Sequence, residues 1–268
     1  MPYARALSPF LLALALSVPC LAEGPNTLTA RERAEGWKLL FDGETMAGWR
    51  DPARKNPPGD AWTIEDGCLK ANPGPRIMED LVSAGTYENF DLRFEWRISP
   101  GGNSGVKYRI QDLIFLAPGK FPKFEDQVDY SLLHRPAARP AQGQEYVIGF
   151  EYQVIDNGHH EDALRGAKYQ AAGLYDLVGP VKDQTRPVGE FNEGRIVLRG
   201  DRVEHWLNGV KVVDIDLSAA ARGASKRWGE SSPVYGMLAK QPRRNCPLSL
   251  QNHNDAAWFR NLRVRRLP

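Results

Sequence analysis

Acid, base and amide side chains are concentrated in residues 149–162, which read GFEYQVIDNGHHED. In the first half of this stretch every second residue is apolar, and the polar positions between them include Glu151 and Gln153. A period of two predicts a strand that buries its apolar face. The opposite face then presents a carboxylate, which can accept a proton, and an amide, which can bind hydroxyl groups.

The second half of this stretch predicts a loop with three candidate cation ligands, Asp156, His160 and Asp162. Carboxylate oxygens and imidazole nitrogens bind hard or borderline divalent cations. An ordinary polar turn has the same composition, and for so short a motif the turn is the simpler interpretation.

Other predicted strands also carry polar residues opposite their apolar faces. Residues 90–98 have the clearest alternation in the chain, and residues 105–110 resume it. The polar positions on all these strands are Glu95, Arg97, Lys107, Arg109, Glu151, Gln153, Gln251 and His253. Forked donors, carboxylates and amides suit sugar hydroxyls, so we expect these residues to line a groove on the outer face of one sheet.

One histidine follows a different pattern. His205 alternates in phase with Val203 and Leu207, so it shares their apolar face. The pattern alone therefore predicts a core histidine whose ring nitrogens are hydrogen-bonded.

The order of the predicted elements indicates an all-β protein. Short strands, among them residues 171–177 and 248–253, are separated by turn dipeptides such as Asp66-Gly67 and Asn208-Gly209, and residues 218–228 are the one convincing helical candidate. This pattern predicts a sandwich of two antiparallel sheets of the jelly-roll kind. We find no repeat of fixed period, which argues against a propeller.

Residues 111–146 break the alternation with many prolines and aromatic residues. A segment of this length is too long for an ordinary hairpin connection, and such loops are usually functional or disordered. The aromatic residues favour packing over disorder. We expect a lid or a groove wall, with an inter-subunit contact as the alternative.

Length and charge limit the classes of partner. The 268 residues carry a formal net charge of +2 with both signs mixed along the chain, so nucleic acid is not an indicated partner. A chain of this length forms one large β domain or two small ones, and it buries a full core without disulfides.

The N-terminal residues 1–22 have the features of a secretory signal peptide. Arg5 supplies the positive end, residues 7–18 are an apolar run too short to span a bilayer, and small residues precede cleavage after Ala22. We therefore expect an exported protein, periplasmic or extracellular, without stable membrane insertion. Cys20 suggests a lipoprotein as the alternative, but the proline before it is a poor match for a lipidation site.

Two cysteines, Cys68 and Cys246, remain in the exported chain. One disulfide and two buried free thiols are both compatible with the sequence, because spacing does not show whether their Cα atoms come close.

Six segments, taken in order, resemble the 3-keto-disaccharide hydrolase family across residues 36–267. They are GWKLLFDGETMAGW, FDLRFEWRISPGGNSGVKYR, GFEYQVIDN with the following HHEDA, AAGLYDL, VEHWLNG and LSLQNHNDAAWFRNLRVRRL. The resemblance implies a single concanavalin A-like jelly-roll domain over residues 36–268, preceded by a lead-in at 23–35. The chain departs from the family at 111–146, an apparent insertion, and at Asn254, where the family usually has glycine.

The resemblance also implies activity on glycosides whose sugar carries a ketone at C3. In this hypothesis Glu151 or His205 is the base that removes the C2 proton. Arg109, together with a divalent cation near Asp156, His160 and Asp162, stabilises the enolate. The implied substrate-binding residues are Glu95, Arg97, Asn103, Gln153, Tyr175, Gln251 and His253. No organic cofactor is implied.

Two other classes of function remain open at this stage. Jelly rolls also serve as non-catalytic, lectin-like carbohydrate-binding modules, and fold does not determine function. An ordinary glycoside hydrolase with a pair of carboxylates is the third candidate.

Overall fold

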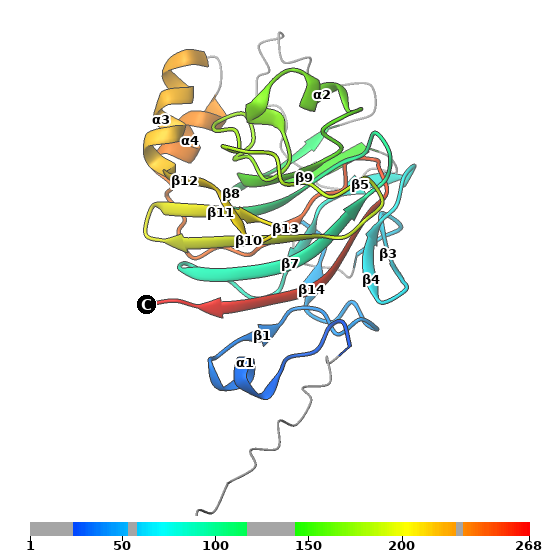
Figure 1. The fold of residues 1–268 in the computed structure, drawn as a ribbon. Helices are drawn as coiled ribbons and strands as arrows, with labels where there is room; N and C mark the ends of the chain where they lie inside the picture. Colours follow the sequence, from blue (N-terminus) through cyan, green and yellow to red (C-terminus); the bar gives the residue numbers. More distant parts are fainter. Residues whose placement is uncertain (1–23, 53–57, 117–142, 229–232) are drawn as a thin grey trace, which may run out of the picture.

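The computed structural model describes residues 24–52, 58–116, 143–228 and 233–268. Within these ranges two sheets pack face to face as a β-sandwich (Figure 1), as the alternation predicts. The larger sheet has eight strands and the smaller one has six. Neighbouring strands are antiparallel, except that β5 and β9 run parallel.

The larger sheet has the strand order β12-β11-β10-β7-β14-β4-β3, and β1 pairs with β14. Its strands are β1 (Lys38–Leu39), β3 (Trp62–Glu65), β4 (Cys68–Ala71), β7 (Phe90–Ile98), β10 (Asn192–Arg199), β11 (Arg202–Leu207), β12 (Val210–Asp216) and β14 (Ala257–Arg266).

The smaller sheet has the order β2-β6-β13-β8-β9-β5. Its strands are β2 (Trp49–Arg50), β5 (Ile77–Glu79), β6 (Leu81–Ser83), β8 (Asn103–Leu116), β9 (Gly143–Ile155) and β13 (Ser249–Leu250). The long pair β8 and β9 forms the middle of this sheet.

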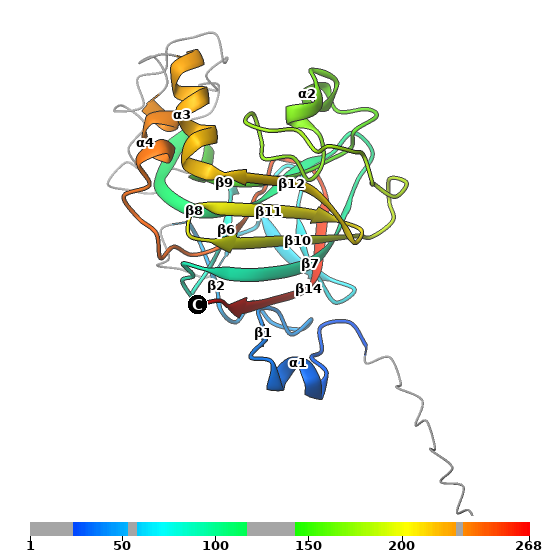
Figure 2. The ribbon, with the colours of Figure 1, turned by 60° about the vertical axis from the view of Figure 1, so that its left-hand side comes forward.

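Short helices lie around the sandwich. They are α1 (Ala30–Ala34), α2 (Glu161–Leu164), the 3-10 turn η2 (Ala167–Tyr169), α3 (Leu217–Trp228) and α4 (Pro233–Lys240). Figure 2 shows α3 and α4 together at one end of the sheets and α2 apart from them. None of the helices in the described ranges is long and apolar enough to cross a membrane.

Strand β7 illustrates why this sequence forms a sandwich. Its apolar positions, from Phe90 to Ile98, are all buried, with exposed fractions of 3% or less. Between them Arg93, Glu95 and Arg97 point to the other face and are partly exposed. The apolar face meets the apolar face of the smaller sheet and forms one core from both sheets.

Turn residues at the hairpins have the conformations that their sequences predict. Asp66-Gly67 connects β3 to β4, and Asn208-Gly209 connects β11 to β12, with positive φ at all four residues. A pair of left-handed residues matches the twist of two antiparallel strands, and asparagine, aspartate and glycine tolerate it best.

A wide bulge interrupts the pairing of β8 with β9. Tyr108 pairs with Phe150 and Asp112 pairs with Ile148, so three residues of β8 face only Gly149 of β9. Arg109, the first of the three, has a φ of 52°. A Cβ atom on Gly149 would lie 2.7 Å from the Tyr108 carbonyl oxygen. The bulge therefore requires glycine on the opposite strand.

The N-terminal segment 24–37 lies across the outer face of the larger sheet. Asn26 and Asn261 exchange hydrogen bonds, each backbone N–H donating to the other side-chain oxygen at 2.6 and 2.8 Å. Thr29 and Glu32 form a capping box at α1, and Glu32 also pairs with Arg263 at 3.3 Å. These bonds fix the segment along β14.

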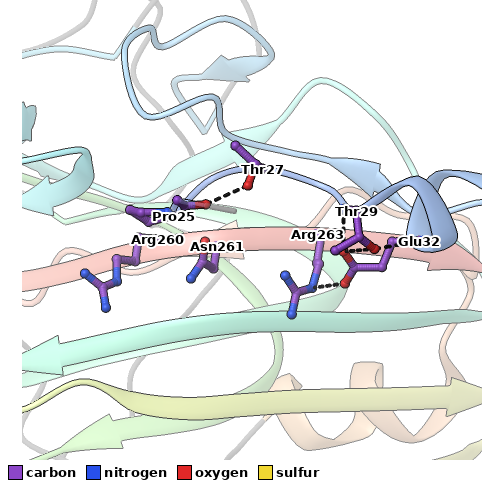
Figure 3. A pocket seen from close by; sticks show the side chains of 8 residues that line it. Pro25, Thr27, Thr29, Glu32, Arg260, Asn261 and Arg263 are labelled. Atoms are coloured by element: carbon purple, nitrogen blue, oxygen red, sulfur yellow. Dashed lines mark hydrogen bonds and ion pairs between the residues drawn. The ribbon is translucent and has the colours of Figure 1, made fainter. Parts of the chain in front are cut away.

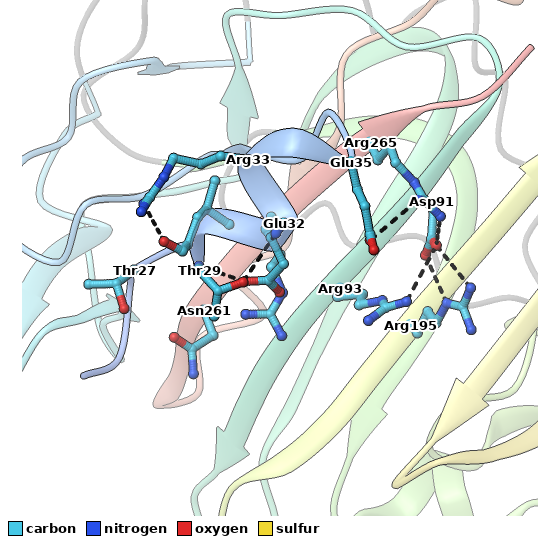
Figure 4. A network of polar contacts seen from close by, with 12 residues as sticks. Thr27, Thr29, Glu32, Arg33, Glu35, Asp91, Arg93, Arg195, Asn261 and Arg265 are labelled. Carbon is cyan, nitrogen blue, oxygen red and sulfur yellow. Dashed lines mark hydrogen bonds and ion pairs between the residues drawn. The ribbon is translucent and has the colours of Figure 1, made fainter. Parts of the chain in front are cut away.

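Ion pairs continue from this segment over the same face (Figure 4). Arg195 binds the buried carboxylate of Asp91 through two hydrogen bonds of 2.8 and 2.9 Å, and Arg265 approaches it at 3.4 Å. The Trp37 ring packs against the guanidinium groups of Arg93 and Arg265. Much of the polar surface of this sheet is thus occupied by contacts within the protein.

Several sequence expectations need correction. Residues 171–177 form turns with isolated bridges rather than a strand, and only two residues of 248–253 belong to a strand. The helix α4 was not predicted. The ends of the 111–146 segment extend β8 and β9, because alternation resumes after the bulge; residues 117–142 lie outside the described residues, as does the predicted signal peptide 1–22.

The two cysteines are free. Cys68 is buried beside β3, and Cys246 is buried in a small cluster with Val82, Ile110 and Val147. The sequence left a disulfide and two buried free thiols open, and the structure shows two buried free thiols.

Replacing Gly149 by alanine should lower the free energy of unfolding by about 1–3 kcal/mol, because its Cβ would overlap the Tyr108 carbonyl and force the bulge to move. Urea unfolding measures the change. Gly158→Ala is the control, since its nearest neighbour lies at an ordinary contact distance of 3.5 Å. Equal stability of the two variants would contradict a steric requirement for glycine in the bulge.

Candidate functional site

The middle of the smaller sheet places a carboxylate and an amine next to each other on its outer face. In the register of β8 and β9, Lys107 lies opposite Glu151, and Gly105 lies opposite Gln153. The residues between them, Val106 and Tyr152 among others, are in the core. The predicted outward positions of Glu151 and Gln153 agree with this arrangement.

Glu151 depends on the absence of a side chain at Gly105. A Cβ atom there would lie 1.9 Å from one carboxylate oxygen of Glu151, so the carboxylate occupies the space above the glycine. Burial raises the pKa of Glu151 to about 7; Lys107 opposes the increase, and the negative charges of Asp80 and Asp162 add to it. A carboxylate with this pKa is a suitable general base near neutral pH.

Tyr175 stands beside this carboxylate. Its backbone N–H donates to the Glu151 carbonyl at 3.0 Å, and its hydroxyl donates to Asp162 at 3.2 Å. Burial, together with the charges of Asp162 and Glu151, raises the pKa of the phenol. Tyr175 is therefore a neutral hydroxyl that can hydrogen-bond to a ligand.

Buried amides extend the same face toward the start of β8 and the end of β9. Gln153 donates to the side-chain oxygen of Asn103 at 3.2 Å, and both residues are at most 3% exposed. The backbone N–H of Asn103 in turn donates to Asp255 at 3.1 Å. The predicted residues Asn103 and Gln153 thus lie between Glu151 and a cluster of candidate cation ligands.

The predicted ligand set Asp156, His160 and Asp162 is not the set that the structure brings together. Asp156 accepts hydrogen bonds from the backbone of Gly101 (2.8 Å) and Gly158 (2.9 Å) and from His159 (2.9 Å). Although burial opposes the shift, these donors hold the pKa of Asp156 below its ordinary value. Its carboxylate therefore fixes the loop after β9. Asp162 pairs with Arg165 at 2.7 Å and accepts from Tyr175.

His160 instead meets two residues from the segment between β13 and β14. Candidate ligand atoms of His160, His253 and Asp255 all lie within 4.8 Å of one another. Two imidazoles and one carboxylate form a donor set that suits a borderline divalent cation such as zinc, iron or manganese. The Asn103 N–H donates to the Asp255 carboxylate and so holds it in place, as expected for a metal ligand whose position is set before the metal binds.

The backbone at Asn254 explains one departure from the family pattern. Its φ of 70° lies in the left-handed region, which glycine adopts freely and which asparagine tolerates better than most residues. The turn that separates His253 from Asp255 is therefore kept although the usual glycine is absent.

Arg109 does not lie where the alternation predicted. The bulge turns it away from Lys107 and Glu151, and its guanidinium donates to the Gly200 carbonyl at 2.8 Å in the turn between β10 and β11. The side chain is almost completely buried, at 1% exposed. The prediction that Arg109 lies beside the base is wrong.

Glu95 and Arg97 lie on the other sheet. Glu95 pairs with Arg260 at 2.8 Å, and the Arg97 guanidinium is 4.3 Å from the Trp258 ring centroid. Strand alternation identified their outward direction correctly. It did not reveal that β7 and β9 belong to different sheets, so these two residues cannot share a groove with Glu151.

His205 is a core residue, as its alternation predicts. Its Nδ1 donates to the Ala172 carbonyl at 3.0 Å, which leaves Nε2 to accept from the Tyr108 hydroxyl at 2.9 Å. Burial lowers the pKa of His205 to about 4, so the ring is neutral near pH 7. Both nitrogens are engaged inside the sandwich, and the alternative role of His205 as the base is not supported.

Sequence reasoning missed Asp80 and Asp255. Asp255 follows His253 by two residues, a spacing that would have placed a second ligand candidate in the same loop. Asp80 reaches Lys107 from a distant part of the chain, and no local pattern identifies such a contact.

A cavity of about 360 Å³ lies away from this site, between the N-terminal segment and β14 (Figure 3). Its charged residues are already paired, Arg260 with Glu95 and Arg263 with Glu32. We assign the chemistry to the Glu151 face because the candidate base and ligand cluster are there.

A family model described as a 3-keto-alpha-glucoside-1,2-lyase-like domain matches residues 36–265 of the chain. A "3-keto-disaccharide hydrolase" from Bacteroides thetaiotaomicron is 32% identical over 272 residues, which cover 96% of this chain and 87% of that protein.

Solved structures give the same picture of the fold. A "putative glycosyl hydrolase" from Parabacteroides distasonis matches with a TM-score of 0.63 and 25% identity, covering 91% of this chain and 100% of the other. A second structure with the same description, also from Parabacteroides distasonis, matches with a TM-score of 0.57 and 22% identity, over 86% of this chain and 99% of the other.

The pKa of His205 predicts an acid dependence of stability. In the unfolded chain the imidazole binds a proton near pH 6.5, whereas the folded protein keeps it neutral down to about pH 4. The unfolded state thus binds more protons, and stability should fall by up to about 3 kcal/mol as the pH decreases across this window. Urea unfolding of the wild type and of His205→Asn measures it; parallel profiles would contradict the assignment.

Proposed function

The chain belongs to the 3-keto-alpha-glucoside-1,2-lyase-like domain family, and on this premise we propose that it cleaves glycosides whose sugar is oxidised to a ketone at C3. The observation that carries the proposal is Glu151, a half-buried carboxylate with a pKa of about 7 on an outer face lined by hydroxyl-binding groups. The relatives support carbohydrate cleavage in general. The oxidised substrate and the elimination route are our proposal.

A ketone at C3 makes the hydrogen on C2 acidic. The Glu151 carboxylate takes this proton, and the electron pair of the C–H bond forms the enolate of the ketone. The enolate then reforms the carbonyl while its electron pair forms the C1–C2 double bond. The bond from C1 to the glycosidic oxygen breaks, and this oxygen leaves with the bonding pair and takes up the proton held by Glu151, which gives an alcohol. Addition of water across the resulting C1–C2 double bond completes a net hydrolysis.

This route agrees with the distribution of charge at the site. It requires one base of suitable pKa. An ordinary glycoside hydrolase instead requires two carboxylates at a fixed separation. Tyr175 and Gln251 would bind hydroxyl groups close to Glu151, while Asn103 and Gln153 would act further along the same face. These groups hold the sugar so that its C2 hydrogen points to the carboxylate.

We also propose that His160, His253 and Asp255 hold a divalent cation. Their three candidate ligand atoms within 4.8 Å support a fit, and partial burial together with the neighbouring His160 lowers the pKa of His253, which favours the neutral imidazole that a metal requires. A cation there would stabilise negative charge on the substrate oxygen. The protein residues bind and orient the sugar in either case.

Replacing Glu151 by glutamine should lower kcat/KM for a 3-keto-disaccharide by about 100-fold to 10,000-fold, because the amide cannot accept the C2 proton. The amide has almost the same shape, so the melting temperature should change little. Turnover is measured by the appearance of reducing sugar, together with loss of the C2 deuterium in a labelled substrate.

The control is Glu161→Gln, which changes an exposed glutamate in the neighbouring helix α2. It should retain wild-type turnover. Full activity of Glu151→Gln would refute the role of this carboxylate. Unoxidised disaccharide, tested in parallel, separates the alternatives: an ordinary glycoside hydrolase cleaves it, and a lectin-like module binds it without cleaving either sugar.

If His160, His253 and Asp255 hold a cation, substitutions of Asp255 and Asp162 should differ in their effect on metal binding. Asp255→Asn should weaken divalent-metal binding by about tenfold or more, whereas Asp162→Asn should leave it nearly unchanged, because Asp162 binds Arg165 and Tyr175 instead. Metal content after equilibrium dialysis measures both. Dialysis of the wild type against a chelator should also reduce turnover; unchanged metal content in Asp255→Asn would remove this site from the mechanism.

A further inference from the structure

A buried ion pair that includes Lys107, the cross-strand neighbour of Glu151, has no part in the chemistry described so far. The Lys107 ammonium is 2.9 Å from Asp80, and the two side chains are 4% and 0% exposed. Asp80 sits between β5 and β6 and also accepts the backbone N–H of Val147 at 3.1 Å. Asp80 therefore connects β8 and β9 to the junction of β5 and β6.

Gln251 connects this pair to the candidate base. With the amide nitrogen turned toward Glu151, the nitrogen donates to a carboxylate oxygen at 3.2 Å and the amide oxygen accepts from the Lys107 ammonium at 3.2 Å. The opposite orientation would place oxygen against carboxylate and nitrogen against ammonium. Electrostatics thus selects the first orientation, and Asp80, Lys107, Gln251 and Glu151 form a continuous chain of polar contacts.

We propose that Lys107 and Asp80 are positioning residues that control the ionisation of Glu151, with Gln251 fixing the direction of its carboxylate. The inference rests on the proposed function, because it assigns a purpose to this ion pair only if Glu151 is the base. Neither residue needs to touch the substrate for this role.

The charges that face Glu151 act in opposite directions. Lys107, directly across the strand pair, favours the carboxylate; Asp80 behind it and Asp162 on α2 disfavour it. The neighbouring Tyr175 is neutral. Because Asp80 is in contact with Lys107, it cancels much of the attraction that the ammonium would exert on Glu151. Burial is the main cause of the raised pKa of Glu151, and because Asp80 offsets Lys107 the ammonium does not reverse it.

Two variants test this arrangement by the direction in which they move the pH dependence of activity. Asp80→Asn removes a negative charge that opposes the ionisation of Glu151 and keeps the favourable charge of Lys107, so the carboxylate form of Glu151 becomes more stable. The acid limb of the pH profile of kcat/KM should move down by about one pH unit. In the double variant Asp80→Asn with Lys107→Met both charges are gone, and the downward movement should disappear. A purely structural role predicts lower activity in both variants with no movement of the limb.

The ionisation of Glu151 can also be measured without turnover. Carbon-13 NMR of protein labelled at glutamate carboxyls, with Glu151→Gln to assign the signal, gives the titration in the wild type and in both variants. A lowered midpoint in Asp80→Asn that the second substitution reverses supports the inference. An unmoved midpoint in Asp80→Asn, or a lowered midpoint that persists in the double variant, overturns it.

The two readouts separate the inference from the proposed function. If the wild type does not consume 3-keto-disaccharide, the proposed function fails, whatever the NMR titration gives. If the wild type is active and loses activity in Glu151→Gln, but Asp80→Asn moves neither the acid limb nor the NMR midpoint, the inference alone fails.

Discussion

The pairing of β8 with β9 determines which side chains lie on the outer face of the smaller sheet. Its register sets Lys107 opposite Glu151 and Gly105 opposite Gln153, so one glycine creates the space that the carboxylate occupies. Because side chains alternate between faces, a shift of one residue would exchange these groups for the core residues beside them. The bulge at Gly149 ends this regular stretch and sends Arg109 elsewhere. The candidate base and the amide of Gln153 thus lie on the part of the strand pair between the bulge and the loop after β9.

The two outer faces of the sandwich have different uses. On the larger sheet, the polar side chains form hydrogen bonds and ion pairs with one another and with the N-terminal segment. Asp91, which binds Arg195, is an example, and Glu32 with Arg263 is another. The partly exposed pairs of this network, such as Arg263 with Glu32, contribute little stability individually, but together they fix the segment against the sheet. On the smaller sheet, the polar residues Gln153, Asn103 and Lys107 are buried. Burying such groups costs free energy, which is consistent with a role in binding.

Sequence alone predicted the β-sandwich and the outward positions of Glu151 and Gln153. The period-two alternation identified β7 and β9, and turn dipeptides identified two hairpins, because both signals depend on neighbouring residues. Alternation places Glu95 and Glu151 equally well on an outer face but contains no information on which sheet a strand joins. The prediction for Arg109 was wrong because a bulge interrupts the alternation at this residue. The sequence signal of the bulge is Gly149, which lies on the other strand. The place of Asp80 beside the candidate site follows from its contact with Lys107, which is distant in the sequence, so no local pattern could have revealed it.

The choice between the two candidate bases follows from their hydrogen bonds. His205 uses both ring nitrogens inside the core, and a proton on Nε2 would remove the acceptor for the Tyr108 hydroxyl, leaving a buried donor to be satisfied. To reach a sugar, the imidazole would also have to break its bond to Ala172 and open the packing between the sheets. Glu151 is already on an outer face, and its burial raises its pKa into the range where proton abstraction is effective. The same desolvation that keeps the histidine neutral and inert therefore makes the carboxylate the stronger candidate.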